Sequence, residues 1–174
     1  MNRKPNLKRK DSGFTLVELL VVIALLGISI GVTSDILVSL VRSYNKTQIK
    51  NEVEQQANFV GLKLEREIRS SEGVSPVGYT NALVIQKEDG VSVTYRVYGN
   101  ILQVEYSPTT ITPLTNTDGI SGILVSCPSY GGNCFSVVGE VAPQTVMMHI
   151  RFTPALGNSH EYADIINVVS PRNY

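Results

Sequence analysis

The chain has 174 residues, of which 43% are hydrophobic and 17% charged, with 14 glycines and 8 prolines spread along the sequence. This length suits one folded domain with its termini, and the composition excludes a largely disordered chain. The formal net charge is zero, but five of the 15 basic residues precede position 11, so the chain beyond residue 13 has 10 basic against 14 acidic residues. That balance does not fit a nucleic-acid-binding protein, and we expect no nucleic acid among its partners.

Residues 14–41 form an apolar segment that holds only two charged residues, Glu18 and Asp35, and no proline. Its length and composition predict a membrane-spanning helix. Because a basic segment precedes it, the positive-inside rule predicts that residues 1–13 lie in the cytoplasm and that the chain after about position 40 is exported. A secretory signal peptide fits less well, since the apolar run is too long and no Ala-x-Ala-like site ends it.

Beyond residue 41 the helical pattern becomes amphipathic. Apolar side chains recur at steps of three or four residues: Ile49, Val53, Ala57, Val60, Leu64 and Ile68. Opposite charges four residues apart support the same helix: Lys50/Glu54, Lys63/Glu67 and Glu65/Arg69. We therefore predict one helix over residues 14–70, with an apolar stripe on its outer part. Its end is marked by Gly73, Pro76 and Gly78.

From residue 81 the pattern changes to the alternation of strands. Turn pairs at 89–90 and 99–100 predict an antiparallel meander of strands 82–87, 91–98 and 101–106. After a turn-rich stretch from residue 107 to 119 come strand candidates at 120–126, 134–138, 145–152 and 161–169. The fold class is therefore α+β, a long N-terminal helix packed on a C-terminal antiparallel sheet over residues 81–169.

These elements divide the chain into three parts. Residues 1–13 are a leader, residues 14–41 a transmembrane helix, and residues 42–174 an exported globular head that combines the amphipathic helix 42–70 with the sheet. The head is long enough to bury a core of its own.

Cys127 and Cys134 lie in a Pro- and Gly-rich stretch, CPSYGGNC. Their spacing fits neither a Cys-x-x-Cys redox pair nor a zinc half-site, and no histidine lies near enough in sequence to complete one. In an oxidising compartment we expect a disulfide that closes a small loop; two unpaired thiols are the alternative.

Gly27 and Gly31 match two patterns at once, because Ser29 lies between them. A Gly-x-Ser-x-Gly nucleophile elbow needs a strand before it and a base nearby, and neither is predicted here. Close packing of helices through a Gly-x-x-x-Gly motif suits the apolar segment, where ordinary small residues are the alternative. A membrane-tethered hydrolase that uses Ser29 or a residue of the head is kept as a rival to a structural role.

The two histidines, His149 and His160, are expected to be solvated rather than ligands. No cluster of Cys, His and carboxylates, no phosphate-binding loop and no pairing of nucleophile with base is found in the sequence. We therefore predict a protein that is not an enzyme and that has neither a cofactor nor a metal site.

The junction between leader and apolar helix, KRKDSGFTLVELLVVIALLGI at residues 8–28, resembles the processing site of type IV prepilins. In that family a membrane aspartic peptidase cuts after the Gly and N-methylates the new first residue. The resemblance implies that Gly13 ends the leader, that Phe14 is the mature N-terminus, and that Glu18 is the acidic residue of the family. A simple uncut signal anchor is the alternative.

Glu18 stands out on physical grounds as well, because an ionisable residue in a spanning helix costs about 2.5–3.5 kcal/mol at the bilayer centre. Cleavage after Gly13 would create a cationic amine at Phe14. That amine can pair with the Glu18 carboxylate of a neighbouring subunit and fix the axial register of assembly. Solvation of Glu18 by lipid headgroups is the alternative.

Three later stretches look like minor pilins and J-type minor pseudopilins of type II secretion: LEREIRSSEGV at 64–74, VTYRVYGNILQVEYS at 93–107 and VVSPRNY at 168–174. This resemblance implies the pilin fold and a low-copy subunit that primes or caps a filament. The implied partners are other pilin or pseudopilin subunits, the prepilin peptidase, an inner-membrane assembly platform and, before assembly, membrane lipid. The implied location is the bacterial inner membrane, with a cytoplasmic N-terminus, and then an extracytoplasmic filament. A single-pass anchored binding protein or adhesin with an uncut N-terminus is the rival from another class.

Overall fold

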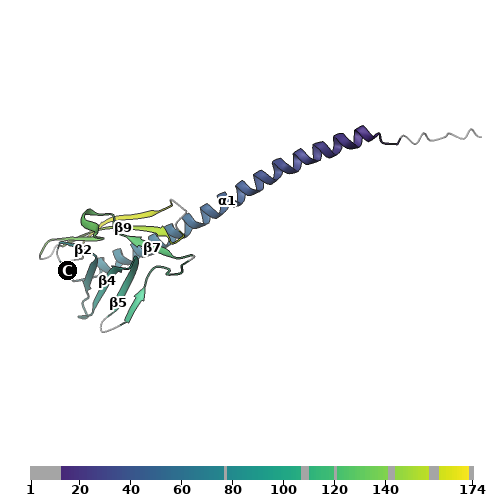
Figure 1. The fold of residues 1–174 in the computed structure, drawn as a ribbon. Coiled ribbons are helices and arrows are strands. Elements are labelled where there is room, and N and C mark those ends of the chain that lie inside the picture. Colours follow the sequence, from purple (N-terminus) through teal and green to yellow (C-terminus); the bar gives the residue numbers. More distant parts are fainter. Residues whose placement is uncertain are drawn as a thin grey trace, which may run out of the picture. The chain divides into compact units, whose positions relative to one another are not determined.

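A computed structural model describes residues 13–76, 78–106, 110–119, 121–140, 144–156 and 161–172. The expected leader, apart from Gly13, and His160 lie outside these residues. The described chain divides between Tyr44 and Asn45 into two compact units. A single helix, α1 (Leu16–Arg69), contributes its first part to one unit and its second part to the other (Figure 1).

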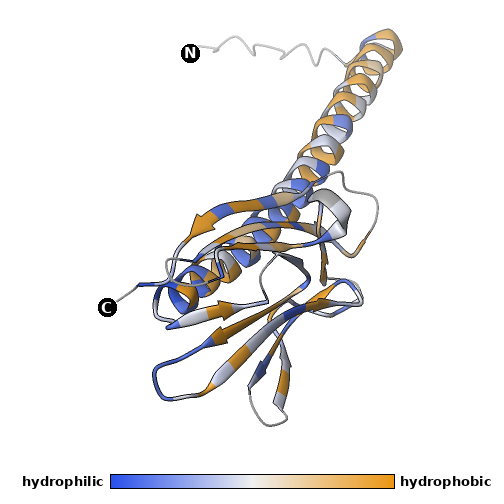
Figure 2. Cartoon of the chain, turned by 90° about the vertical axis from the view of Figure 1, so that its left-hand side faces the viewer, coloured by the Kyte–Doolittle hydropathy of each residue, from blue (hydrophilic) through white to orange (hydrophobic). Residues whose placement is uncertain are grey.

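The first part of α1 is exposed throughout, from its start to Tyr44. Its large apolar side chains are 47–78% accessible, although such residues are normally buried. Figure 2 shows hydrophobic residues dominating this part of the ribbon. The helix is long and apolar enough to cross a membrane, which agrees with the predicted spanning segment. It continues through Asp35 without a break.

The second part of α1 buries the predicted apolar stripe. The residues with the least exposure are Val53, Ala57, Val60, Gly61, Leu64 and Ile68, and Ile49 is half-buried where the stripe begins. The stripe continues past Gly61 because that position faces Ile165, whose side chain lies only 3.2 Å from where a Cβ would stand. A larger side chain at position 61 would push Ile165, and the strand to which it belongs, away from the helix.

Two of the three predicted ion pairs on the helix are present, Lys50/Glu54 at 3.8 Å and Glu65/Arg69 at 2.7 Å. The third was wrong: Glu67 pairs with Lys87, 2.8 Å away, and not with Lys63. Lys87 comes from the turn between two strands that pack beside the helix, so tertiary packing replaces the local pair. The helix ends at Arg69, and the Ser71 hydroxyl donates to the Ile68 carbonyl at 2.7 Å.

In the ranges that the structure describes, ten strands follow the helix and form two antiparallel sheets. Sheet A has the order β1-β3-β4-β5-β6 and consists of β1 (Gly73–Ser75), β3 (Ala82–Gln86), β4 (Ser92–Tyr98), β5 (Ile101–Tyr106) and β6 (Thr110–Pro113). Sheet B has the order β10-β9-β8-β2, with β7 also paired to β9, and consists of β2 (Gly78–Thr80), β7 (Ile123–Ser126), β8 (Phe135–Val138), β9 (Thr145–Pro154) and β10 (Ala163–Val169). Figure 1 shows β2, β7 and β9 in one group and β4 and β5 in another.

The α+β class and the central meander are confirmed. Gly99 and Asn100 both have positive φ, 58° and 63°, which is the backbone of a type I′ hairpin turn. The single sheet over residues 81–169 was wrong, because the strands divide between two sheets and begin at Gly73. The turn-rich stretch after residue 107 also contains a strand, β6. Its sequence has only a weak strand pattern, and its hydrogen bonds to β5 hold it in the extended conformation.

Polar side chains join the two sheets. The Gln144 amide, at the start of β9, accepts from the Val74 N–H at 2.8 Å and donates to the Val74 carbonyl at 2.9 Å. The Gln144 amide therefore bonds the edge of β1 as a neighbouring strand would. It supplies hydrogen-bond partners for the Val74 N–H and carbonyl, which would be costly to bury unpaired. The helix stripe and the inner faces of both sheets form one apolar core, whose largest members are Tyr95, Phe135 and Phe152.

Candidate functional site: the N-terminal processing and assembly segment

The predicted cleavage bond lies just before the start of α1. Gly13, Phe14 and Thr15 are not helical, and Phe14 is 79% exposed. Thr15 caps the helix, since its hydroxyl oxygen accepts from the Glu18 N–H at 3.3 Å. This Thr-x-x-Glu spacing is that of a capping box, and an acidic side chain in the first turn also suits the helix dipole. The bond between Gly13 and Phe14 is therefore outside the helix, in backbone that a peptidase can reach.

Glu18 lies in the first turn of α1 and points into open surroundings. Among the residues that the structure describes, no cationic group lies within ion-pair distance of its carboxylate. Pairing with the Phe14 amine of a neighbouring subunit stays a prediction, and the single chain leaves the Glu18 side chain accessible for it.

The hydroxyl groups of the apolar segment are satisfied within the helix. Ser29, Thr33 and Ser34 each donate to the carbonyl four residues earlier, at 2.7–2.9 Å. Such bonds hide polar groups from lipid. Ser29 thus lies in mid-helix with its hydroxyl bonded to the Leu25 carbonyl, and the strand and turn of a nucleophile elbow are missing at this place.

Gly27 and Gly31 leave the helix surface bare. A Cβ atom at either position would meet no atom within 4 Å in the single chain. Their use for close packing against another helix stays a prediction. The available surface is what such packing requires, because small residues let two helix backbones approach.

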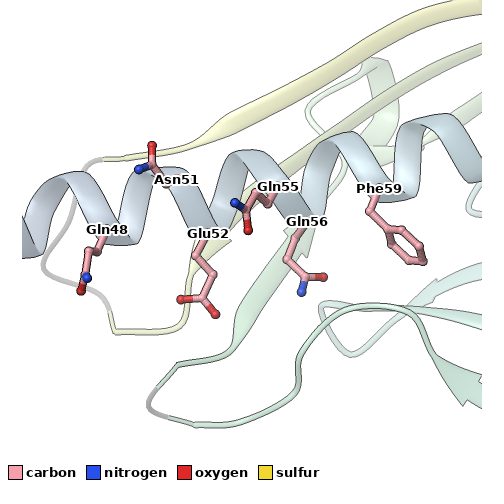
Figure 3. A pocket seen from close by; sticks show the side chains of 6 residues that line it. All are labelled: Gln48, Asn51, Glu52, Gln55, Gln56 and Phe59. Atoms are coloured by element: carbon pink, nitrogen blue, oxygen red, sulfur yellow. The ribbon is translucent and has the colours of Figure 1, made fainter.

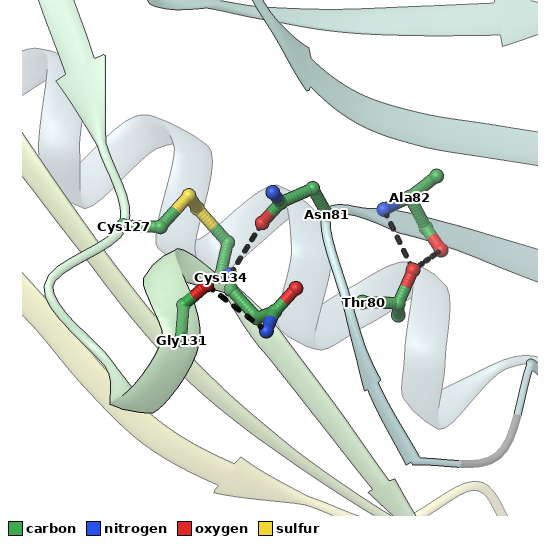
Figure 4. Close-up of a disulfide and its surroundings, with 7 residues drawn as sticks. Thr80, Asn81, Ala82, Cys127, Gly131 and Cys134 are labelled. Atoms are coloured by element: carbon green, nitrogen blue, oxygen red, sulfur yellow. Dashed lines mark hydrogen bonds between the residues drawn. A yellow bond between two sulfur atoms is a disulfide. The ribbon is translucent and has the colours of Figure 1, made fainter.

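The predicted disulfide between Cys127 and Cys134 is present, with Cα atoms 4.6 Å apart. Cys134 is fully buried, and its N–H donates to the Asn81 side-chain oxygen at 2.9 Å, as Figure 4 shows. The bonded loop is thereby fastened both to β7, which precedes Cys127, and to the segment that leads into β3. Its role is to hold the head together.

His149 is not the simple solvated residue that the sequence predicted. Its side chain is 28% exposed, and Nε2 lies 3.9 Å from an Asp164 carboxylate oxygen. Arg151 donates two hydrogen bonds to the same carboxylate, at 2.7 and 2.8 Å, and stacks over the Tyr162 ring. The hydrogen bonds from Arg151 hold the pKa of Asp164 below its usual range. Single-sequence reasoning had no signal for this cluster, because the register of β9 against β10 creates it.

One shallow pocket, of about 580 Å³, lies along the second part of α1 (Figure 3). Its lining is mostly amide side chains together with one carboxylate and one ring: Gln48, Asn51, Gln55, Gln56, Glu52 and Phe59. In the described ranges, no group of three or more His, Cys, Asp or Glu side chains is placed to hold a metal ion.

The N-terminal segment also matches a known family. A family model described as the prokaryotic N-terminal methylation motif matches residues 8–34, a span that includes the predicted cleavage bond and Glu18. The exposed apolar helix follows in the expected order. The motif and this helix together fit a type IV prepilin-like protein.

For this prepilin-like protein, the motif implies processing by a prepilin peptidase and assembly with pilin subunits. The apolar helix is consistent with anchoring in a membrane. No curated protein and no solved structure matches the chain. The family match ends at residue 34 and does not cover the head.

Proposed function

We propose that this prepilin-like protein is a minor pilin or pseudopilin, a structural subunit that enters a type IV pilus or type II secretion pseudopilus and helps to initiate it. The observation that carries the proposal is the change along α1. The methylation motif and an exposed apolar stretch come first, and a stripe built into the core of the head follows. The first part suits lipid before assembly and the helices of neighbouring subunits afterwards.

The proposed chemistry of assembly uses Phe14 and Glu18. Cleavage after Gly13 releases a cationic amine four residues before Glu18, and methylation keeps the positive charge. In a bundle of staggered helices, the amine of one subunit meets the Glu18 carboxylate of another. Both charges are otherwise costly in an apolar environment, so the pairing specifies one axial register.

The same proposal assigns no catalytic role and no cofactor to the chain. The hydroxyl of Ser29 donates to the Leu25 carbonyl of its own helix, and His149 and Arg151 both lie beside the Asp164 carboxylate on the outer face of sheet B. Cys127 and Cys134, the two cysteines, are joined in the disulfide and provide no nucleophile.

In this account the protein sits in the bacterial inner membrane with a cytoplasmic N-terminus and passes to an extracytoplasmic filament after processing. Its partners are the prepilin peptidase, an assembly platform in the membrane and other pilin or pseudopilin subunits. An anchored binding protein or adhesin is the competing function, and it requires that the subunit stays in the membrane with its leader uncut.

The test is incorporation into filaments. Cells that carry the chain with a C-terminal tag are sheared, and filaments are separated from membranes. We expect the tagged chain in the filament fraction, and we expect deletion of the chain to lower the number of filaments. A tagged chain found only in membranes, with filaments unchanged after deletion, would contradict the proposal and favour the anchored binding protein.

A further inference from the structure

The outer face of sheet B is apolar at its centre. Across neighbouring strands, the outward residues pair in the order Val168, Met147, Ser136 and Tyr79. Val168, Met147 and Tyr79 are 58%, 47% and 68% exposed, and Ile166, next to Val168 on the same face of β10, is 72% exposed. We call Ile166, Val168, Met147 and Tyr79 the sheet patch. Since an antiparallel sheet with one covered face normally turns polar residues outward, an apolar patch of this kind marks an interaction surface.

Sheet A provides the contrast. On its outer face Thr94 pairs with Glu105, and the Arg96 guanidinium lies 3.7 Å from the Glu105 carboxylate. Tyr98 and Ile111 are also exposed on this face, at 70% and 50%, but polar residues such as Arg96 and Glu105 separate them. Exposed apolar residues are therefore more closely grouped on sheet B than on sheet A.

A second uncovered surface runs along the outer side of α1. Six residues recur at alternating steps of four and three: Gln48, Glu52, Gln55, Phe59, Leu62 and Arg66. At about 100° per residue they share one face, opposite the buried stripe. Phe59 and Leu62 are 55% and 69% exposed, and Figure 3 shows Gln48, Glu52 and Phe59 on the same side of the helix. We call these six residues the outer helix stripe.

At one end, the two surfaces have complementary charges. In the outer helix stripe, Glu52 and Arg66 stand at opposite ends, about 21 Å apart along the axis, and neither has an ion-pair partner among the described residues. Beside the sheet patch, the Arg151 charge at one end is already compensated by Asp164, whereas the exposed Glu140 follows β8 at the other end. From Arg151 to Thr145, where β9 begins, is six residues, or about 20 Å.

The complementarity holds when two copies point the same way. Within one head, β10 runs in the direction of α1, because Glu161 contacts Lys46 at 3.0 Å and Asn167 contacts Glu65 at 3.2 Å. The Arg151 end of the patch therefore lies toward the start of α1 and the Glu140 end toward its finish. A parallel neighbour would therefore bring its Arg66 to the Glu140 end.

We propose that the outer helix stripe of one copy of this chain docks on the sheet patch of the next copy, with Phe59 and Leu62 against Met147 and Ile166. The contact joins two different surfaces, so each pair leaves one stripe and one patch free and can extend into a filament. The inference rests on the proposed function, because a filament is what supplies neighbours with a common direction. It also requires more than one copy of the chain in each filament.

The test uses cysteine crosslinking of full-length chains in their membrane. The native cysteines are bonded to each other, so an introduced cysteine is the free thiol to be followed. Leu62→Cys and Met147→Cys chains with different tags are expressed together and treated with a short bis-maleimide. We expect a mixed dimer that joins position 62 to position 147. A Thr94→Cys chain, with its cysteine on the polar face of sheet A, should give none with the Leu62→Cys chain.

Charge reversal provides a second measurement. Arg66→Glu in the Leu62→Cys chain should lower the yield of the mixed dimer about twofold to fivefold, as expected for an exposed ion pair. Glu140→Lys in the Met147→Cys chain should restore it. This rescue separates docking from simple misfolding of either variant.

Dimers of Leu62→Cys with itself or of Met147→Cys with itself, crosslinks only to a different protein, or the absence of any dimer from fully reactive thiols would each overturn the docking proposal. Incorporation of the parent chain into filaments is scored in the same cells. A missing mixed dimer with normal incorporation rejects the docking alone, whereas a parent chain that never enters filaments rejects the proposed function.

Discussion

From Leu16 to Tyr44, α1 exposes its apolar side chains all around, whereas from Asn45 to Arg69 it buries one stripe and exposes the rest. Both parts have the same backbone conformation. In the second part, the partner of the apolar stripe is the sheets of the same chain. In the first part the partner must come from elsewhere, since no described residue covers it. One helix thus has two apolar surfaces that need separate partners, and each can be tested by itself.

The largest expected effect belongs to the uncovered part. Glu18→Ala should leave the membrane level of the chain unchanged or higher, because a neutral residue inserts more easily. Its entry into filaments should fail, since the Phe14 amine of the neighbouring subunit loses its partner, at a cost of about 3–5 kcal/mol for a buried pair. Co-purification with partner subunits is the measurement.

Asp35→Ala is the matched control for Glu18→Ala, because it removes the other carboxylate of the apolar segment. It should assemble normally. Recovery of Glu18→Ala in filaments at the level of the natural chain would remove the role assigned to Glu18.

The same substitution in the two parts of α1 sharpens the comparison. Leu64 is fully buried in the head and Leu26 is 55% exposed. Leu64→Ala should lower the free energy of unfolding of the head by about 2–5 kcal/mol, and Leu26→Ala should change it by less than about 0.5 kcal/mol. Chemical denaturation of the full chain in detergent, followed by near-ultraviolet circular dichroism of the head, measures both. Equal effects of the two variants would show that the parts do not differ as described.

The disulfide is expected to have the next largest effect. Replacing both Cys127 and Cys134 by Ala should lower the free energy of unfolding of the head by about 2–3 kcal/mol, because the reduced chain regains the freedom of a short loop. Adding a reductant to the natural protein should have a similar effect and should leave the double variant unchanged. Alkylation of both cysteines in the exported protein, without reductant, would show instead that the bond does not form in the cell.

The smallest effect concerns Tyr95, whose side chain is fully buried in the head. Burial raises the pKa of the Tyr95 phenol, with a further contribution from the charge of Glu67. The folded state therefore holds this proton more tightly than the unfolded state, so the stabilisation is complete below about pH 10 and declines as the pH rises further.

Tyr95→Phe should remove this part of the alkaline instability and change stability at pH 7 by no more than about 1 kcal/mol, because the Tyr95 hydroxyl has no hydrogen-bond partner in the part of the chain that the structure describes. Denaturation midpoints between pH 8 and pH 11, a range set around the ordinary tyrosine pKa of about 10, provide the measurement. An unchanged pH profile in Tyr95→Phe would refute the assignment.

The sequence predicted the parts of the fold that are coded locally. The helix, its buried stripe and the hairpin at Gly99 and Asn100 follow from spacing and turn chemistry over a few residues. The division into two sheets could not be predicted in this way. It depends on β1, which has three residues, and on Gln144, which binds Val74 from 70 positions away.

For the candidate site the same distinction holds. Gly13, Phe14 and Glu18 stand in one continuous motif, so a single sequence is enough to find them. The sheet patch was missed, because Met147 and Ile166 look like ordinary strand residues until the register of β9 against β10 places them on the outer face. Phe59 and Leu62 were missed as well, since exposure in the folded head is what distinguishes them from the buried stripe.

The mass of the mature chain tests the central claim most directly. Protein extracted from membranes and analysed intact by mass spectrometry should begin at Phe14 with one methyl group on its amine, because the bond after Gly13 lies in exposed, non-helical backbone within the matched motif. A chain that retains Met1, or that begins at any residue other than Phe14, would contradict the account.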